Sequence, residues 1–405
     1  MSKVAVTGLG IICCLGRGIK KVWPRLLNGE TRFQPISLPG FSDFVNRIGG
    51  EVSLADHSYL PSSLSRHEKF GLAAAVEALD DSGLAADMTY KSHEVGLFAG
   101  IGASAMLEAE DWLTRYYQYH TLIPGRKLHG YPASSLADFL ADKYDINGSR
   151  LSVATACSSS LTSLGLASDQ IKNKRIKAAV VVGAEGLSRL TYGGFHALHS
   201  IAPESCQPFD KNRKGIFLGE GGACLILEDF NHAIDRGAKI YCEIKGWGLS
   251  SDCFHMTAPH PQGDGAGRAM IQALTQAGLA PRDIGYINTH GTGTRQNDTA
   301  ETNGIKTVFA DHAQNLLLSS TKSMTGHCLG AAGAIESVIS VLALYHEHCP
   351  PTASLTCADP QCDLNYLPLS ARKKTGLCHV MNNVLAFGGN NVSAVFSKNI
   401  RVNHD

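Results

Sequence analysis

Residues 153–161 read Val-Ala-Thr-Ala-Cys-Ser-Ser-Ser-Leu, a short run of small and apolar residues that leads to one cysteine and three serines. Apolar residues at helical spacing follow as far as Ala167. We therefore predict a strand that delivers the Cys157 thiol to the first turn of a helix, where free N–H groups and the positive end of the helix dipole gather. Such a position lowers the pKa of a cysteine and favours the nucleophilic thiolate. The commoner role of a cysteine, a small buried core residue, stays open for Cys157 alone.

The composition is that of a large globular protein with no preference for nucleic acid. The chain has 405 residues, is 44% hydrophobic, and carries 36 basic and 36 acidic side chains. Its length and apolar content predict a substantial core in two or three parts, and its zero net charge gives no reason to expect a nucleic-acid partner. The 12 cysteines are scattered without a C-x-x-C pair. We expect free thiols in the reducing cytoplasm, with neither a secretory signal nor a membrane span.

Short buried strands alternate with helices along the whole chain, which predicts an α/β architecture. The expected strands lie at 4–10, 95–100, 178–185, 223–228, 240–250, 284–288, 316–320, 380–385 and 392–397. The expected helices lie at 65–82, 157–167, 265–278, 299–309 and 328–347. A helix rich in small residues follows a strand twice, once from Cys157 and once from His327. This repetition indicates an internal duplication, with halves at 1–230 and 231–405.

The first strand, from Val4, enters what we interpret as a glycine turn at Gly8-x-Gly10. Two glycines at this spacing suggest a dinucleotide site. However, Cys13 stands where the third glycine of that motif belongs, so we do not expect nucleotide binding.

Three further segments carry chemically useful residues at predicted strand ends. They are residues 288–294 with His290, residues 320–327 with Lys322 and His327, and the glycine turn 387–391. Each has an ordinary interpretation: a hydrogen-bonding histidine, a surface lysine, a hairpin turn. Together they follow one rule, that functional groups gather at the carboxyl ends of parallel strands. We therefore expect them to meet Cys157 at one sheet edge.

These motifs, in this order over nearly the whole chain, resemble those of the β-ketoacyl-acyl-carrier-protein synthase family, the condensing enzymes of fatty-acid and polyketide synthesis. The matching segments are Val6–Gly10, Ala156–Ser160, Gly219–Gly222, His290–Thr294, Lys322 to His327 and Phe387–Gly389. The resemblance implies a thiolase-like fold. In that fold two similar halves, each with a mixed five-stranded sheet, form α-β-α-β-α layers, usually in a dimer.

The resemblance also implies roles for the residues. Cys157 would be the nucleophile that takes an acyl chain from the phosphopantetheine thioester of an acyl carrier protein. The N–H groups of Cys157 and Phe387 would form the oxyanion hole, with Gly388 and Gly389 in the same turn. His290 and His327 would hydrogen-bond to the malonyl thioester carbonyl as carbon dioxide leaves.

Supporting roles follow from the same resemblance. Lys322 would hold His327 and the local charge in order, and Phe387 would gate the passage between acyl pocket and malonyl site. Thr292 and Thr294 would bind the pantetheine arm, while Asp298 and Glu301 would order the histidine loop. We expect no metal and no cofactor, because decarboxylation needs hydrogen-bond donors at the developing negative charge and no Lewis acid.

Several alternatives concern pathway and partners. Ala386 stands where the family often has glycine, and the Cys-Ser-Ser-Ser-Leu context resembles polyketide-type synthases more than fatty-acid ones. We therefore favour a specialised type II pathway, such as a polyketide or polyene. We expect either a homodimer or a heterodimer with a related ketosynthase-like subunit, such as a chain-length factor. A coenzyme A thiolase fits less well, because two histidines and a lysine suit the decarboxylating branch, and His327 excludes the initiating synthases with one histidine and one asparagine.

Two regions are expected to form the surface around the site. Residues 30–65 and the aromatic-rich 101–139 are predicted cap elements that shape the acyl tunnel and the dimer contact. Arg66 and Lys69, at the start of a helix, are candidates for docking an acidic carrier protein. A solvated helix face is the commoner role for such residues.

Overall fold

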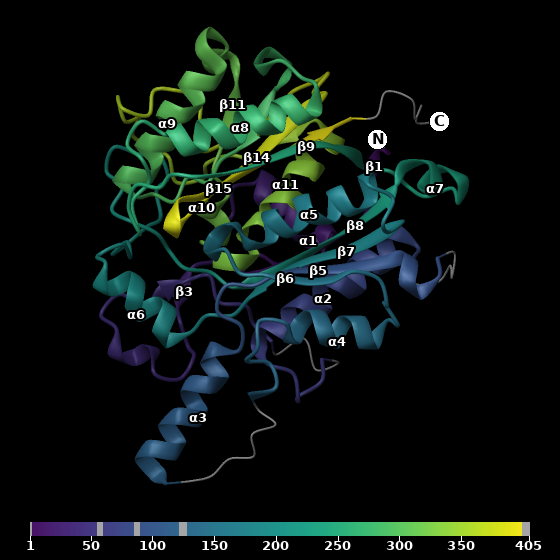
Figure 1. Ribbon diagram of the computed structural model, residues 1–405. Helices are drawn as coiled ribbons and strands as arrows, with labels where there is room; N and C mark the ends of the chain where they lie inside the picture. The colour runs from purple at the N-terminus through teal and green to yellow at the C-terminus, as the bar shows by residue number, and fades with distance from the viewer. Residues whose placement is uncertain (1, 55–59, 85–89, 121–127, 399–405) are drawn as a thin grey trace.

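The computed structural model describes residues 2–54, 60–84, 90–120 and 128–398 (Figure 1). The strands are β1 (Val4–Cys13), β2 (Gly16–Arg17), β3 (Gln34–Pro35), β4 (Ile48–Gly49), β5 (Val95–Gly100), β6 (Arg150–Val153), β7 (Ala178–Glu185), β8 (Gly221–Asp229), β9 (Cys242–Ser251), β10 (Tyr286–Asn288), β11 (Leu317–Ser319), β12 (His348–Cys349), β13 (Arg372–Lys373), β14 (His379–Ala386) and β15 (Asn390–Ser397). The helices are α1 (Ile19–Leu27), α2 (Arg66–Ser82), α3 (Met106–Tyr119), α4 (Ser135–Lys143), α5 (Ser159–Lys172), α6 (Arg189–Ala197), α7 (Phe230–Asp235), α8 (Asp264–Ala277), α9 (Arg295–Phe309), α10 (Lys322–Thr325) and α11 (Ala332–His346).

Two five-stranded sheets have the same strand order and the same directions. In the N-terminal half, β6-β5-β7-β8-β1 pair as parallel, parallel, antiparallel and antiparallel neighbours. In the C-terminal half, β11-β10-β14-β15-β9 repeat that sequence of pairings. The two sheets join where Ala5 and Val6 of β1 lie opposite Glu243 and Cys242 of β9. The predicted thiolase-like fold of two similar halves is confirmed.

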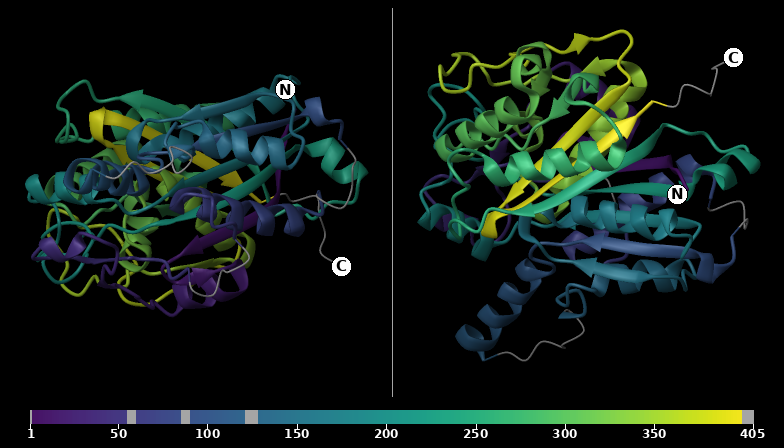
Figure 2. Two further views of the ribbon diagram at one scale, coloured as in Figure 1. Left: turned by 90° about the horizontal axis from the view of Figure 1, so that it is seen from below. Right: turned by 45° about the horizontal axis from the view of Figure 1, so that its top comes forward.

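Helices form the remaining three layers. Helices α2 and α4 cover the outer face of the N-terminal sheet, and α8 covers the outer face of the C-terminal sheet (Figure 1). Helices α5 and α11 pack against each other between the two sheets. The right-hand view of Figure 2 shows α8 over the yellow strands β14 and β15, and shows α3 standing away from the body of the molecule.

The central position of α11 explains its composition. By length and apolar content alone, the segment Leu329–His346 could cross a membrane, although the sequence predicted no such span. However, 89% of this segment is buried inside the protein. A helix buried on all sides is hydrophobic all round, so the apolar run belongs to the core.

The Gly8-x-Gly10 motif was interpreted as a turn, and that interpretation is wrong. Both glycines lie within β1, which continues to Cys13. A Cβ at Gly8 would lie 2.2 Å from the Ala78 carbonyl oxygen of α2, and one at Gly10 would lie 2.0 Å from that of Ala74. These glycines therefore let strand β1 approach helix α2 closely.

The C-terminal half has the same close contact between a strand and its outer helix. A Cβ at Gly246 of β9 would lie 2.4 Å from the Ala273 carbonyl oxygen of α8, and one at Gly248 would lie 2.2 Å from that of Ala269. Two glycines spaced by two on a strand thus meet two alanines spaced by four on a helix, in both halves. This match supports the duplication at the level of packing.

The start of α2 corrects another sequence interpretation. Ser65 and Glu68 form a capping box at this start. The Arg66 side chain is only 12% exposed and forms an ion pair with Glu220, whose carboxylate also accepts the N–H groups of Val52 and Leu187. Arg66 therefore holds the interior of the N-terminal half together and is not available to dock a carrier protein.

Candidate active site

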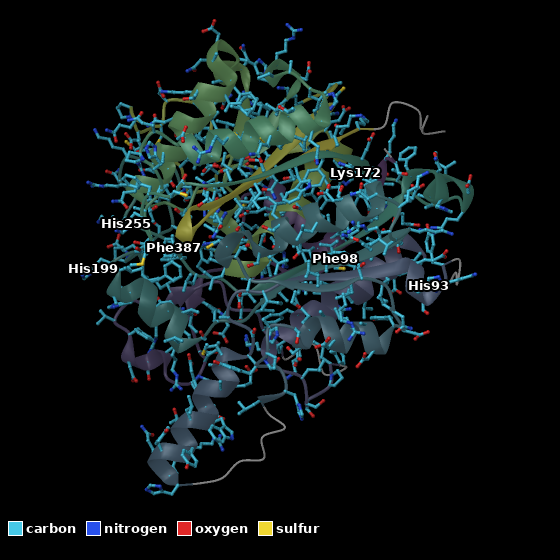
Figure 3. All side chains as sticks on the ribbon, viewed as in Figure 1. His93, Phe98, Lys172, His199, His255 and Phe387 are labelled. Carbon is cyan, nitrogen blue, oxygen red and sulfur yellow. The ribbon has the colours of Figure 1, made fainter. Side chains whose placement is uncertain are left out.

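One cavity of about 150 Å³ opens at the carboxyl ends of the parallel strands. Its lining includes Cys157, His290, His327 and Phe387, which come from four separate segments. Thr292 and Thr294 also line it, whereas Gly388 does not. Figure 3 places Phe387 at the same end of the molecule as His199 and His255, and away from His93. The fold thus brings the predicted residues together at one sheet edge.

The Cys157 turn is tight and held by hydroxyl groups. Strand β6 ends at Val153, and Cys157 lies in the 3₁₀ turn η4 (Ala156–Ser158) directly before α5. The Ser159 hydroxyl accepts the Thr155 N–H at 2.9 Å and donates to the Ala156 carbonyl at 2.6 Å. Ala156 has a φ of +52°, a conformation that residues with a side chain rarely adopt. The small and hydroxyl residues around Cys157 therefore shape the turn that presents the thiol.

The predicted lowering of the Cys157 pKa is wrong. Burial raises the pKa of this thiol to about 12, although the Lys322 charge and the Phe387 N–H act in the opposite direction. The side chain is 6% exposed, and the loss of water around the thiolate outweighs the favourable start of the helix. Cys157 therefore keeps its proton at neutral pH, and a nucleophilic role for its sulfur would require a nearby acceptor for that proton.

His327 places a possible acceptor for this proton beside the thiol. Its Nε2 lies 3.0 Å from the Cys157 sulfur. Its backbone is fixed from two sides, because its N–H donates to the Phe217 carbonyl at 2.7 Å and its carbonyl accepts the Gly219 N–H at 3.0 Å. This bridge to residues 217–219 explains the Gly219–Gly222 motif, since a Cβ at Gly219 would lie 2.4 Å from the Thr325 carbonyl oxygen.

His290 follows strand β10 on a loop held by two buried carboxylates. Glu301 accepts the N–H groups of His290 and Gly291, both at 2.8 Å. Asp298 accepts those of Thr292 at 3.0 Å and Gly293 at 3.2 Å. The rings of His290 and His327 are nearly perpendicular, at 84°, with their centroids 5.3 Å apart. Both imidazoles therefore face one small volume beside Cys157.

Lys322 is buried and paired with a residue that no sequence motif indicated. The Lys322 ammonium donates a hydrogen bond to Glu336 of α11, and the two side chains are 1% and 2% exposed. Burial, followed by the Lys322 charge, holds the pKa of both His290 and His327 well below its usual value. Both imidazoles are neutral at physiological pH. Glu336 could have been suspected as the one acidic residue inside the apolar helix.

The Phe387 turn closes the cavity opposite Cys157. Residues Phe387–Gly389 form a 3₁₀ turn between β14 and β15, with φ values of +78° at Gly388 and +74° at Gly389. The Phe387 ring stacks on Phe195 with centroids 5.3 Å apart. The Gly388 N–H donates to the Met256 carbonyl at 2.8 Å. Phe195 and the loop around Met256 were not predicted, because neither carries a motif.

Comparisons with known proteins agree with this arrangement. The "Beta-ketoacyl synthase, N-terminal domain" family model matches residues 1–233, and the "Beta-ketoacyl synthase, C-terminal domain" model matches residues 241–356. A 3-oxoacyl-[acyl-carrier-protein] synthase 2 of Coxiella burnetii is 38% identical, with 98% of each chain covered.

Two solved structures have the same fold as this chain, and their sequence identities to it are nearly equal. The ishigamide ketosynthase/chain length factor superposes with a TM-score of 0.93 at 30% identity, covering 98% of this chain and 99% of that one. A type II polyketide ketosynthase in complex with its acyl-carrier protein, bound to the hexaketide, gives a TM-score of 0.92 at 29% identity, with the same coverage.

Proposed function

The chain belongs to the β-ketoacyl synthase family and is a condensing enzyme, and from this premise we propose that Cys157 carries the acyl chain while His290 and His327 act on the malonyl unit. The observation that carries this assignment is the 3.0 Å approach of His327 Nε2 to the Cys157 sulfur, with the His290 ring beside it. A thiol, a neutral imidazole acceptor and a second imidazole in one cavity suit acyl transfer followed by carbon–carbon bond formation.

The first step loads the acyl chain. The Cys157 sulfur attacks the thioester carbonyl of the acyl carrier protein, and its proton passes to His327 Nε2. The tetrahedral oxyanion is stabilised by backbone N–H groups, of which that of Phe387 points toward Cys157. Collapse breaks the bond to the pantetheine sulfur, which takes the proton from His327. A neutral His327 is suited to this task because it can first accept and then return the proton.

The second step extends the chain. With malonyl-carrier protein bound, the carbon–carbon bond to the carboxylate breaks and carbon dioxide leaves. The electron pair develops as an enolate, whose oxygen accepts hydrogen bonds from the N–H group of His290 and from that of His327, which for this step carries its proton on Nε2. The carbanion attacks the acyl-Cys157 thioester, and the Cys157 thiolate leaves and regains its proton from solvent. The product is a β-ketoacyl chain on the carrier protein, longer by two carbons.

Four further assignments support these steps. Lys322, paired with Glu336, adds its charge to the effect of burial, and both keep the two imidazoles uncharged. Thr292 and Thr294 bind the pantetheine arm, since both line the cavity and their hydroxyls lie 3.0 Å apart. Asp298 and Glu301 act through the backbone that they hold. Phe387, stacked on Phe195, gates the route to the acyl pocket, and Gly388 and Gly389 permit the turn that this gate requires.

We propose an acyl carrier protein and a second ketosynthase-like subunit as partners. The first is supported by the name of the Coxiella relative and by the ketosynthase–carrier-protein complex, and the second by the ketosynthase/chain length factor structure. Helix α3 stands away from the body and exposes Leu113, Tyr116 and Tyr117, which a second subunit would cover. A mass measurement in solution distinguishes a homodimer from a chain that dimerises only with a partner.

The remaining assignments rest on chemistry. No cofactor is required, because the thiol and the two imidazoles account for every bond change above. All twelve cysteines, each in the described part of the chain, are free, which suits a reducing cytoplasm. A coenzyme A thiolase would need a second cysteine as base, and Cys157 is the one cysteine lining the cavity within the described residues. Because this chain contains the proposed nucleophile, Cys157, we also favour a catalytic subunit over a chain-length factor.

The direct test is condensation with a panel of acyl-carrier proteins and malonyl-carrier protein, with products weighed by mass spectrometry. We expect β-ketoacyl products two carbons longer than the acyl chain supplied, and an acyl adduct on Cys157. Cys157→Ala should lose both, while Cys378→Ala, which changes a thiol far from the cavity, should keep both. Elongation by Cys157→Ala would contradict the proposal. The chain lengths accepted would separate a fatty-acid from a polyketide role.

A further inference from the structure

Glu185 is a fully buried glutamate that the proposed chemistry does not use. It is the last residue of β7 and is 0% exposed. Its Oε1 accepts the N–H of Ala103 at 2.9 Å, and its Oε2 accepts those of Gly102 at 2.8 Å and Gly330 at 3.1 Å. Gly102 and Ala103 follow β5, whereas Gly330 belongs to the C-terminal half. One carboxylate therefore joins segments of both halves.

The Gly330 segment follows one reactive residue along the chain and packs against the turn that carries the other. Gly330 is in the 3₁₀ turn η7 (Leu329–Ala331), which begins two residues after His327 and packs against the Cys157 turn η4. Leu329 has a φ of +44°, which costs energy for a residue with a side chain. Such a turn persists only where its surroundings fix it, and Glu185 supplies one such contact.

The fit around the carboxylate leaves no free space. A Cβ at Gly102 would lie 2.2 Å from Glu185 Oε2, and a Cβ at Gly330 would lie 2.3 Å from the Gly102 nitrogen. The loop after β5 and turn η7 thus touch through their backbones, and the carboxylate bridges them. A small change at Glu185 therefore shifts the two segments relative to each other.

We propose that Glu185 is a positioning residue that fixes the separation of His327 from Cys157 by holding turn η7 against the loop after β5. This inference rests on the proposed function of those two residues. Glu301 holds the other histidine by the same means, since it accepts two N–H groups at His290 and Gly291. Each histidine is thus placed through backbone hydrogen bonds to a buried glutamate, Glu301 from its own half and Glu185 from the other.

The test uses Glu185→Gln, which keeps the shape but presents one carbonyl acceptor and an NH₂ group where N–H donors converge. We expect kcat for condensation to fall about 10- to 100-fold, as for a displaced reacting group. KM for malonyl-carrier protein should stay within about twofold, because Thr292 and Thr294 are untouched. Alkylation of Cys157 by iodoacetamide at pH 8 should be no slower than in the wild type, because a negative charge that raises the pKa of the thiol is removed.

Glu228→Gln is the matched control. Glu228 is also 0% exposed, pairs with Arg236, and lies at the opposite end of the same sheet, since β7 pairs Ala178 with Glu228 but Glu185 with Gly221. The Glu228→Gln variant should lower the midpoint temperature of thermal unfolding without changing kcat per folded molecule. The inference is overturned if Glu185→Gln keeps kcat within twofold of the wild type, or behaves as Glu228→Gln does. Failure of the proposed function would appear in the wild type itself, as absence of any condensation product.

Discussion

The two halves of the molecule share a scaffold but not a chemistry. Both have the same strand order, the same central helix position and the same glycine–alanine contact between the first strand and its outer helix. Yet the N-terminal half contributes the thiol of Cys157, while the C-terminal half contributes His290, His327 and the Phe387 turn. The loop after β5 presents Gly102 and Ala103, whereas the corresponding loop after β10 presents His290. The shared strand order therefore determines the positions at which reactive groups can lie. The residues in the loops after the strands determine which groups these are.

The buried ion pair of the C-terminal half offers the largest expected effect on stability. Lys322→Met leaves the Glu336 carboxylate unpartnered in the core, which should lower the free energy of unfolding by about 3–5 kcal/mol. Glu336→Gln should do the same by leaving the ammonium unpaired. Denaturant unfolding of the double variant should recover part of this loss. Losses that simply add in the double variant would contradict a direct pairing of the two side chains.

The two histidines should separate the steps of the reaction. His290→Ala should slow malonyl decarboxylation by about 10²–10³-fold, as expected for the loss of one oxyanion donor. It should leave acylation of Cys157 nearly unchanged, because the histidine close to the sulfur is His327. His327→Ala should slow decarboxylation similarly and should also slow acylation, although less severely. Acyl-adduct formation followed by mass spectrometry, beside carbon dioxide release, measures both steps. Equal effects of the two variants on acylation would break the assignment.

The shared glycine contact provides a test of the duplication itself. Gly10→Ala in the N-terminal half and Gly248→Ala in the C-terminal half each force a methyl group against a helix carbonyl. Both should lower the free energy of unfolding, by about 1–3 kcal/mol or more, as for an overpacked core. Gly194→Ala is the control, because a Cβ there meets nothing within 4 Å. A large loss in one half only, measured by denaturant unfolding, would show that the two contacts are not equivalent.

The smallest expected effect concerns the protonation state of the Cys157 thiol. Because burial raises the pKa of this thiol to about 12, its thiolate fraction should rise about tenfold per pH unit through the range 7–9. Alkylation by iodoacetamide, followed at the Cys157 peptide by mass spectrometry, should rise in step. A rate that levels off below pH 9 would show a thiolate stabilised by the helix start, as first expected from the sequence.

Motif order was enough to predict the fold and the meeting of Cys157, His290, His327 and Phe387. Each of these residues sits beside glycine or hydroxyl residues that its turn requires, so the local sequence carries the signal. Glu336 and Glu185 were not identified because each acts on a segment far along the chain, and a single acidic residue in an apolar element has no motif. The direction of the Cys157 pKa also depends on burial by both halves, which the local sequence does not contain.

The most direct test of this division of chemistry is carbon dioxide release from malonyl-carrier protein by the Cys157→Ala variant, compared with His290→Ala. We expect Cys157→Ala still to release carbon dioxide, because both imidazoles of the C-terminal half remain, and we expect His290→Ala to lose most of that release. Loss of decarboxylation in Cys157→Ala together with its retention in His290→Ala would contradict the account.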